Sequence, residues 1–595
     1  MARRRRDAWA VARLPEFRMN KRLLLALALS AAVIGLTQYF FPPAPPVTPR
    51  TPATATTPAA PGGDAASLAP GAATTGAVTS AAPAAGAIGD TLAAAVRFDT
   101  TTIAGARATW RIANVGAAPV SVTLPTYKAL DSQGKTDRPV ELVRPGEPLL
   151  RWQLVLRDGP RNRTIDLSRV PFIGTTVDAR TVRYSGRVEN LGVDITYSFV
   201  PDSFVARVAG QVTGLAGPAV LQLALPSGLH SAEADTLEDQ RHLAVAVKPS
   251  RANAKSVAFN SLDVGEEELF EGPLTWVASK SKFFIVGLLT MEGDRPFDEV
   301  VVKGGAVTGK VESNVDAVVR QQLDGGRFRL ELYTGPQEWR RLTALGRDFE
   351  NSNPYGGWLQ GFVQPFARMV IRSLLWMHES LRLEYGWVLV IFGIAVRLVL
   401  WPFNQKAMRS SMKMQAIQPE LQAVQDKYKA DPQKMQQEVM RVYKEHGMSP
   451  FSALSGCLPM LIPMPVFITL FFVFQNTIEF RGVPFLYISD ISQPDHTFII
   501  PILMAASAYA LSWIGMRGMP PNPQAKIMGY VFPAMMFVFF YSAAAGLNLY
   551  YMVQNIAALP QQWLISRERQ RTQKKPGSPS PVMAANGRPA QPKKR

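Results

Sequence analysis

One arginine inside a long apolar segment restricts how this chain can fold more than any other residue. In residues 387–403, sixteen uncharged residues surround Arg397, whose guanidinium stays protonated at physiological pH. Placing an arginine at the centre of a lipid-exposed helix costs roughly 2.5–3.5 kcal/mol, so such residues usually face a bundle interior or a water-filled cavity. The alternative is that Arg397 only snorkels to the helix end at Phe403, which at about 1.5 Å per residue is about 9 Å away. We favour the cavity, which makes Arg397 the first candidate functional residue.

The sequence predicts six membrane-spanning segments, because six apolar stretches approach the roughly 20 residues that cross a bilayer. They are residues 23–41, 387–403, 454–474, 498–514, 527–541 and 547–565. Basic residues gather in three of the flanking segments. Residues 1–22 hold eight basic and two acidic residues, residues 404–449 hold eight and five, and residues 567–595 hold nine and one. Because short cytoplasmic segments retain Lys and Arg, we expect both termini in the cytoplasm and the long segment after the first span outside it.

The first 350 residues divide into three parts by composition. Residues 1–41 read as a basic cytoplasmic N-terminus with an uncleaved anchor helix, and residues 42–90 are an Ala/Pro/Thr linker that cannot bury a core. From 91 to 350 the period becomes two: Val193, Ile195 and Tyr197 alternate with polar residues, which predicts a β-sandwich. We find no nucleophile elbow, phosphate loop or His-metal cluster there, so we expect a spacer or docking platform, no enzyme and no cofactor or metal. The only cysteine, Cys457, lies in a predicted span, so we expect no disulfide.

Two further segments have helical periodicity. Residues 356–382 predict an amphipathic helix, which lies either in the membrane interface or against the sandwich. Its apolar positions are Leu359, Phe362, Val363, Phe366, Met369, Val370, Leu374 and Met377. Residues 404–449 predict a cytoplasmic helical hairpin, with Asp431 as N-cap before Pro432. Its seams are Ile417, Leu421, Val424 and Tyr428 on one arm and Met435, Val439, Val442 and His446 on the other.

The segment from 385 to 566 resembles the YidC/Oxa/Alb family of membrane protein insertases. The resemblance rests on Tyr385-Gly386-Trp387, the Arg397 span ending in Trp401-Pro402, the run from Met412 to Pro419, the segment Gly456 to Pro465, and Gly546-Leu547 with Tyr550-Tyr551 and Asn555. Trp276-Val277-Ala278 and Phe283-Phe284 look like the periplasmic β-supersandwich of the Gram-negative form. The resemblance therefore implies a five-span membrane core, an N-terminal anchor helix and a periplasmic all-β domain, in a multi-pass protein of the bacterial inner membrane.

The resemblance also implies a site and an activity. Nascent membrane proteins would enter the inner membrane through a hydrophilic groove, alone or with the Sec translocon, and no cofactor would be required. Residues that match the family's groove and substrate-contact positions are Arg397, Met464, Phe467, Pro533, Met536 and Tyr551. Asn548, Gln554 and Asn555 either line the groove or hydrogen-bond between helices. Pro463 departs from the family's pattern, where a polar glutamine occurs, and so lowers the groove's polarity.

Other interpretations of the residues remain open beside this one. A channel or secondary transporter would also use an intramembrane arginine, although the sequence shows no internal repeat. The basic tail 567–595 and the cytoplasmic segments predict binding to ribosomal RNA, and anionic lipids attract the same charges.

Overall fold

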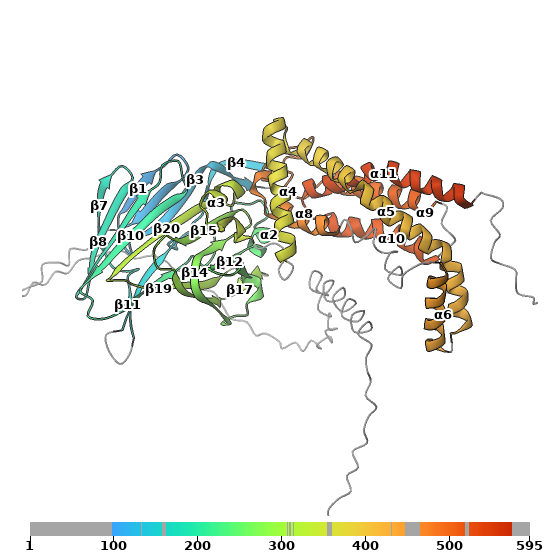
Figure 1. Ribbon diagram of the computed structural model, residues 1–595. Coiled ribbons are helices and arrows are strands. Elements are labelled where there is room, and N and C mark those ends of the chain that lie inside the picture. Colours follow the sequence, from blue (N-terminus) through green and yellow to red (C-terminus); the bar gives the residue numbers. More distant parts are fainter. Residues whose placement is uncertain are drawn as a thin grey trace, which may run out of the picture. The chain divides into compact units, whose positions relative to one another are not determined.

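The computed structural model describes residues 98–131, 134–157, 162–305, 307–308, 311–312, 314–353, 360–429, 431–446, 464–517 and 523–573. Figure 1 shows the strands in blue to green and the long helices that follow them in the sequence in yellow to red. The predicted anchor helix 23–41, the linker 42–90, Cys457, Pro463 and residues 574–595 lie outside the described residues.

The strands form two principal antiparallel sheets. The first contains β1 (Thr100–Ala104), β2 (Thr109–Ala113), β3 (Ala118–Asp131) and β4 (Gly134–Glu141) in that order. The path through the second is β6-β5-β11-β19-β16-β14-β15-β20-β10-β9-β8-β7, and β12 and β13 join it beside β14. Its strands are β5 (Arg151–Leu156), β6 (Arg163–Asp166), β7 (Phe172–Asp178), β8 (Thr181–Val188), β9 (Leu191–Phe199), β10 (Val205–Thr213), β11 (Ala219–Ala224), β12 (Ala244–Pro249), β13 (Lys255–Ala258), β14 (Glu267–Lys280), β15 (Phe284–Thr290), β16 (Phe297–Gly304), β19 (Val315–Gln322) and β20 (Arg327–Pro336).

The two sheets share one apolar core, so the predicted sandwich is present. In β9, Val193, Ile195 and Tyr197 are buried while the residues between them are partly exposed, as the period of two predicts. The Tyr197 hydroxyl donates to the carbonyl oxygen of Ala117, at the start of β3, at 2.8 Å. The rings of Trp110 in β2 and Phe199 in β9 lie 5.2 Å apart. Short elements complete the domain: β17 (Val307–Thr308), β18 (Val311–Glu312), α2 (Thr236–Arg241), α3 (Trp339–Ala344), η1 (Phe259–Ser261) and η2 (Phe349–Ser352).

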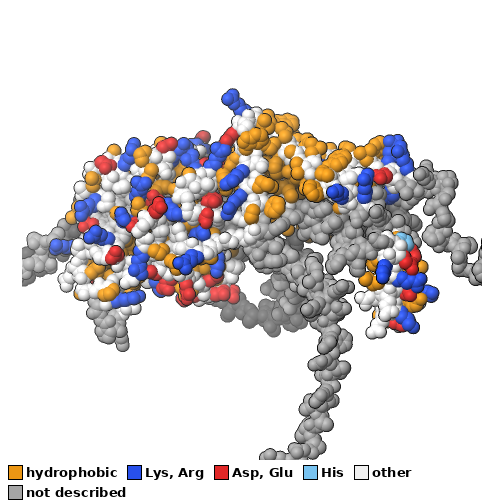
Figure 2. Space-filling view, viewed as in Figure 1, with side chains coloured by type: hydrophobic (Ala, Val, Ile, Leu, Met, Phe, Trp, Pro, Cys, Tyr) orange, Lys and Arg blue, Asp and Glu red, His pale blue; other side chains and the backbone are white. Residues whose placement is uncertain are grey.

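The helices after the β domain are mostly long and apolar. They are α4 (Gln360–Leu381), α5 (Tyr385–Lys427), α6 (Pro432–Glu445), α8 (Met464–Asn476), η5 (Ile478–Phe480), α9 (Ile499–Met516), α10 (Pro523–Phe540) and α11 (Ala545–Gln573). Among the described residues, two stretches are long and apolar enough to cross a membrane, Tyr385–Arg409 and Ile499–Met516, and Gly529–Phe540 is a shorter apolar helix. Figure 2 shows hydrophobic side chains gathered over this helical region, whereas charged side chains are scattered over the β domain.

Helix α11 is the centre of the helical region, with α9 and α5 packed against it. Contacts pair Gly393 with Gln554 and Trp401 with Gln561, so α5 and α11 run parallel. The rings of Phe498 and Tyr541 lie 6.4 Å apart and those of Tyr509 and Tyr530 lie 5.9 Å apart, so α9 and α10 run antiparallel. The N-terminal ends of α5 and α11 therefore lie on one side of the helical region.

Two predicted boundaries differ from the structure. Helix α5 continues without interruption from the apolar span into the first arm of the hairpin, and α6 packs back on it through Ile417, Leu421, Val442 and Tyr443. Asp431 caps α6 by accepting from the backbone N–H of Lys434, as the sequence predicts. The tail predicted from residue 567 begins later, because α11 extends to Gln573.

Helix α4 is amphipathic, but its apolar stripe differs at one predicted position. Val363, Val370 and Leu374 are buried in the core shared with α8, whereas Met369, predicted for the same stripe, is 57% exposed. A polar residue is buried as well: Gln364 donates to Asn351 Oδ1 of η2 at 3.0 Å. Helix α4 therefore packs on two sides, which a single apolar stripe does not predict.

Candidate functional site

Arg397 lies in the middle of the apolar part of α5, and its side chain turns toward α11. It is partly buried, and its Nη2 donates to Oε1 of Gln561 at 2.9 Å. Leu398 and Val399, the next two residues of α5, are exposed on the outside of the helical region. The arginine thus points toward α11 and away from the exposed face of α5, and the groove that the sequence predicts around it stays a prediction.

Gln561 holds the guanidinium and is itself fixed on α5. Its side chain is only 1% exposed. Its Nε2 donates to the carbonyl oxygen of Trp401 at 3.1 Å and to Oε1 of Gln405 at 3.3 Å. Because a backbone carbonyl can only accept, these bonds fix the orientation of the amide, with Oε1 directed at Arg397.

The charge of Arg397 has no carboxylate partner among the residues that the structure describes. No acidic side chain forms an ion pair with it in the part of the chain that the structure describes, and its hydrogen-bond partner is a neutral amide. Nε of Arg397 and Nδ2 of the buried Asn404 have no hydrogen-bond partner among the described residues. The site is therefore rich in donors and carries a net positive charge, which suits carbonyl or carboxylate oxygens of a guest.

The three predicted amides of α11 make contacts between or within helices. Asn548 is fully buried, and its Nδ2 donates to the carbonyl oxygen of Phe540 at 2.8 Å, where α10 ends. Gln554 donates to the Gly393 carbonyl of α5 at 2.9 Å, and Asn555 donates to Ser507 Oγ of α9 at 3.1 Å. These bonds correspond to the helix-to-helix interpretation of the three residues.

The predicted substrate-contact residues come from three helices. Met464 and Phe467 lie in the first turn of α8. Pro533 is inside α10, and Met536 one turn later packs against the buried core of the helical region. The ring of Tyr551 in α11 lies 5.5 Å from that of Phe540 in α10. The structure thus brings Met536 and Tyr551 to one core, while Arg397 contacts a different part of α11, near Gln561.

A loop after α8 packs against the N-terminal ends of α5 and α11. The ring of Phe485 lies against Gly386 so closely that a Cβ there would come within 2.0 Å of the ring. The Ala545 N–H donates to the Gln493 carbonyl at 2.7 Å, and the Gly546 N–H donates to the Ile491 carbonyl at 2.9 Å. Residues 483–493 therefore cover this side of the helical region with a backbone-paired loop.

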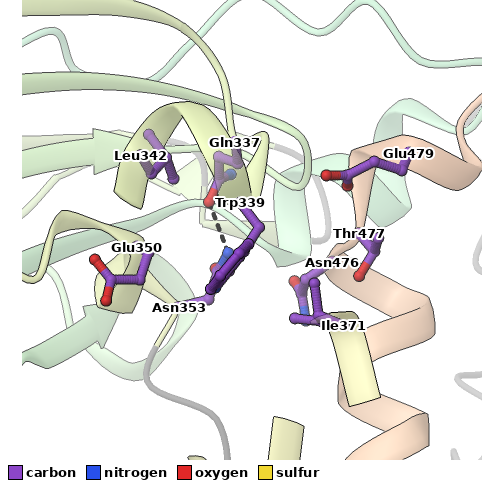
Figure 3. A pocket seen from close by; sticks show the side chains of 9 residues that line it. All are labelled: Gln337, Trp339, Leu342, Glu350, Asn353, Ile371, Asn476, Thr477 and Glu479. Carbon is purple, nitrogen blue, oxygen red and sulfur yellow. Dashed lines mark hydrogen bonds between the residues drawn. The ribbon is translucent and has the colours of Figure 1, made fainter. Parts of the chain in front are cut away.

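The same loop is joined to the β domain and to α4. Arg481 forms a buried ion pair with Glu233, Nε to Oε1 at 2.8 Å. Figure 3 shows a narrow pocket between α3, η2, α4 and the end of α8, into which Glu479 projects and where Asn353 donates to Gln337. Burial raises the pKa of Glu479 to about 7.

The opposite ends of α9 and α11 have aromatic and basic residues in contact. The guanidinium of Arg517 lies 3.7 Å from the ring centre of Trp513, and that of Arg567 lies 4.5 Å from that of Trp563. Arg569, only 8% exposed, donates to the carbonyl oxygen of Gly515 in the last turn of α9 at 2.8 Å. The prediction that the tail begins at residue 567 is therefore wrong for its first seven residues, which belong to α11. Arg569 among them donates to a carbonyl group that the end of the neighbouring helix leaves without a partner inside that helix.

The sequence interpretation missed Gln561, Gln405 and Asn404 as parts of the site. Gln561 is one of several polar residues in the last predicted span, beside Asn548, Gln554 and Asn555. An amide four residues before the end of a predicted span that also carries other amides gives no signal of its partner. The available signal was the arginine, which required a polar partner on some neighbouring helix.

Comparison with known proteins connects this arrangement to a family. Residues 376–574 match the model of a family described as 60Kd inner membrane protein, and residues 100–369 match that of the YidC periplasmic domain. The membrane protein insertase YidC of Anaeromyxobacter dehalogenans (strain 2CP-1) is 30% identical over 485 residues, which are 79% of this chain and 86% of that protein. The chain belongs to the YidC family.

The comparison gives two further similarities. The membrane protein insertase YidC of Chlorobaculum tepidum is 32% identical over 394 residues, 62% of this chain and 65% of the relative, so this match spans just under two thirds of the relative's length. A crystal structure titled as an active YidC insertase with the first transmembrane domain resolved is 16% identical, at 79% coverage of this chain and 94% of that one, with a TM-score of 0.31.

Membership confirms the predicted fold class, a helical membrane core with an all-β periplasmic domain. It places the chain among inner membrane proteins, and the relatives reported above are named insertases, not channels or secondary transporters. The count of five core spans stays a prediction.

Proposed function

We propose that this protein inserts newly made membrane proteins into the inner membrane and assists their folding. Support comes from its membership of the YidC family, whose relatives are named membrane protein insertases. In this proposal the protein is not an enzyme: it forms and breaks no covalent bond, and it requires no cofactor.

The observation that carries the proposal is the positive charge of Arg397, which lies inside an apolar helix and is held by an amide rather than a carboxylate. A polar segment of a nascent chain loses its hydration when it enters a bilayer, and this desolvation is the main barrier to crossing. A guanidinium with unused hydrogen-bonding capacity replaces part of that hydration. The barrier falls most for segments that carry carboxylates, because their charge is opposite.

The substrate's apolar helix would meanwhile contact Met464, Phe467, Pro533, Met536 and Tyr551. Methionine and aromatic side chains accept many apolar sequences, because methionine is flexible and polarizable. The free energy for insertion would come from burying the substrate's apolar span, with the membrane potential acting on acidic segments. No nucleotide takes part. Asn548 and Asn555, which hydrogen-bond to α10 and α9, would keep the helices in place beside this path.

The proposed topology has both termini in the cytoplasm and the β domain in the periplasm, with domains at 1–41, 42–90, 91–350, 356–382 and 385–566 and a basic tail that begins after Gln573, where α11 ends. The loop 483–493 would close the periplasmic side, and the hairpin within 404–449 would lie in the cytoplasm. Two observations support this direction. The Trp513–Arg517 and Trp563–Arg567 pairs combine the interfacial aromatic and the cytoplasmic basic residue that mark an inner membrane surface. Both pairs lie at helix ends opposite the loop.

The proposed partners are nascent membrane proteins, the Sec translocon, the ribosome and anionic lipids. Ribosome and lipid binding would rest on the basic residues of the tail and of the cytoplasmic hairpin, since both RNA phosphate and anionic headgroups attract them.

Site-specific photocrosslinking to a stalled nascent membrane protein tests the path. A crosslinking amino acid at Phe467, Met536 or Tyr551 is expected to capture the apolar segment of the substrate. The matched control is Ile173, an apolar residue on the exposed edge strand β7 of the β domain, which should capture little. Equal capture at Ile173, or none at the three helical positions, would refute the path.

A further inference from the structure

A neutral amide occupies the place next to Arg397 where a carboxylate would ordinarily be found. Arginine in a buried site usually pairs with Asp or Glu, because desolvating a charge is costly unless it is compensated. Here the acceptor is Oε1 of Gln561, at 2.9 Å from Nη2. The amide restrains the guanidinium and leaves its net charge unchanged.

The contacts of Gln561 are arranged for this task. A carboxylate at the same position would have no N–H to give to the Trp401 carbonyl or to Gln405, both of which the amide Nε2 reaches at 3.1 and 3.3 Å. Gln561 therefore joins one turn of α11 to α5 at three points, from a side chain that is almost fully buried. The amide is required twice, as an acceptor for the arginine and as a donor to α5.

We propose that Gln561 is a positioning residue that orients Arg397 and keeps its charge available for acidic groups of the substrate. The inference rests on the insertase function proposed above. It assigns to Gln561 a part in substrate selectivity: the preference for translocated segments with carboxylates depends on the neutrality of residue 561. A carboxylate there would compete with the substrate for the guanidinium, whereas an apolar residue would release the guanidinium from its orientation.

The test compares two substrates in proteoliposomes that contain the purified full-length protein. The substrates are one single-span protein whose short translocated segment carries two Asp residues, and its counterpart with Asn at both places. The measured quantity is the ratio of inserted acidic to inserted neutral substrate. A ratio is insensitive to the amount of folded protein, so a merely structural defect lowers both yields and leaves the ratio as it was.

Gln561→Glu is expected to lower this ratio by on the order of tenfold, because the new carboxylate neutralises the guanidinium. Gln561→Met puts a side chain of similar length without hydrogen-bonding groups at this position, and it is expected to lower the ratio by a smaller factor. If Gln561→Glu does not fold, the ratio of Gln561→Met tests the role of Gln561 instead. The matched control is Gln562→Glu. It adds the same charge one residue away, where the side chain faces Gly515 of α9, and it should leave the ratio unchanged.

The outcomes separate this inference from the function on which it rests. If the unaltered protein inserts neither substrate, the proposed function fails. If the unaltered protein inserts both substrates, two outcomes refute the role of Gln561 and leave the insertase function standing. One is that the Gln561 variants have the same ratio as the unaltered protein. The other is that Gln562→Glu changes the ratio as much as Gln561→Glu does.

Discussion

Replacing Arg481 with alanine should detach the loop after α8 from the β domain. The guanidinium makes three hydrogen bonds there: Nε to Glu233 at 2.8 Å, Nη1 to the Lys128 carbonyl at 2.9 Å and Nη2 to the Ala232 carbonyl at 3.0 Å. It also lies over the ring of Phe284, 5.4 Å from its centre. The side chains of Arg481 and Glu233 are 4% and 2% exposed, so water does not replace these bonds unless the contact opens.

The expected loss follows from the burial of the pair. Removing one partner of a buried ion pair costs about 3–5 kcal/mol, because the other charge is left uncompensated. Replacing both partners with apolar residues is often nearly neutral, since no charge remains buried. Arg481→Ala alone should therefore be severe, whereas Arg481→Met combined with Glu233→Met should be mild.

Hydrogen exchange measures this opening locally, without assuming that a protein of several domains unfolds in one step. A loss of 3–4 kcal/mol should accelerate exchange by roughly two to three orders of magnitude in the backbone amides that close the contact, which lie in residues 478–483 and in β3. Peptides from α9 provide the internal control and should not change. Acceleration below about tenfold in Arg481→Ala, or equal acceleration in the double variant, would show that the ion pair does not hold the contact.

Four further predictions concern other parts of the chain. Arg397→Lys should retain more insertion activity than Arg397→Ala, because we expect the charge to matter more than bidentate geometry; equal loss in an insertion assay would contradict this. Because the pKa of Glu479 is raised to about 7, its contribution to stability is full below about pH 4.5 and is lost as the pH rises to 7, by at most about 1.4 kcal/mol per pH unit. Thermal melts of Glu479→Gln at several pH values should lack this decrease of stability with pH. An unchanged decrease in the variant would assign it to another group. The hairpin 405–447 should exchange faster than the apolar part of α5, because it packs mainly on itself; uniform protection along α5 would mean that the hairpin is docked. Truncation after Gln573 should abolish a salt-sensitive cosedimentation with ribosomes while α11 stays intact, and undiminished cosedimentation would leave the tail to lipid or solvent.

The elements that sequence periodicity predicted well are those whose period is fixed by a single buried face. Strand β9 alternates because one face packs on the first sheet, and the seams of α5 and α6 recur at helical spacing because each arm buries one stripe. Helix α4 departs from its predicted stripe at Met369, since it packs on α8 by one side and on η2 through Gln364 by another. A period describes one buried face, so an element with two different neighbours is predicted only in part.

The partners of the buried charges lay beyond any local pattern. Gln561 is 164 residues from Arg397, and Glu233 is 248 residues from Arg481. Both arginines stand in uncharged or weakly charged surroundings, which shows that a partner must exist but not which residue supplies it. Arg569 was expected in the basic tail, because its neighbours in the sequence are basic and polar. Its burial depends on the carbonyl groups at the end of α9, which no property of residues 567–573 shows.

Arg397, Arg481 and Arg569 differ in what compensates their charge, and the difference follows their place in the fold. Arg481, in the loop that joins the β domain, has a carboxylate, and its pair forms a closed contact that needs no further ligand. Arg397 and Arg569, in the helical core, contact an amide and a backbone carbonyl, which are dipoles without net charge. Dipoles stabilise a cation at short range but leave its field at longer range, where a mobile anionic group still experiences it. A glutamate at 561 would neutralise Arg397 and would also lose the bonds to the Trp401 carbonyl and to Gln405, so the amide joins α11 to α5 and at the same time leaves the charge of Arg397 available to a guest.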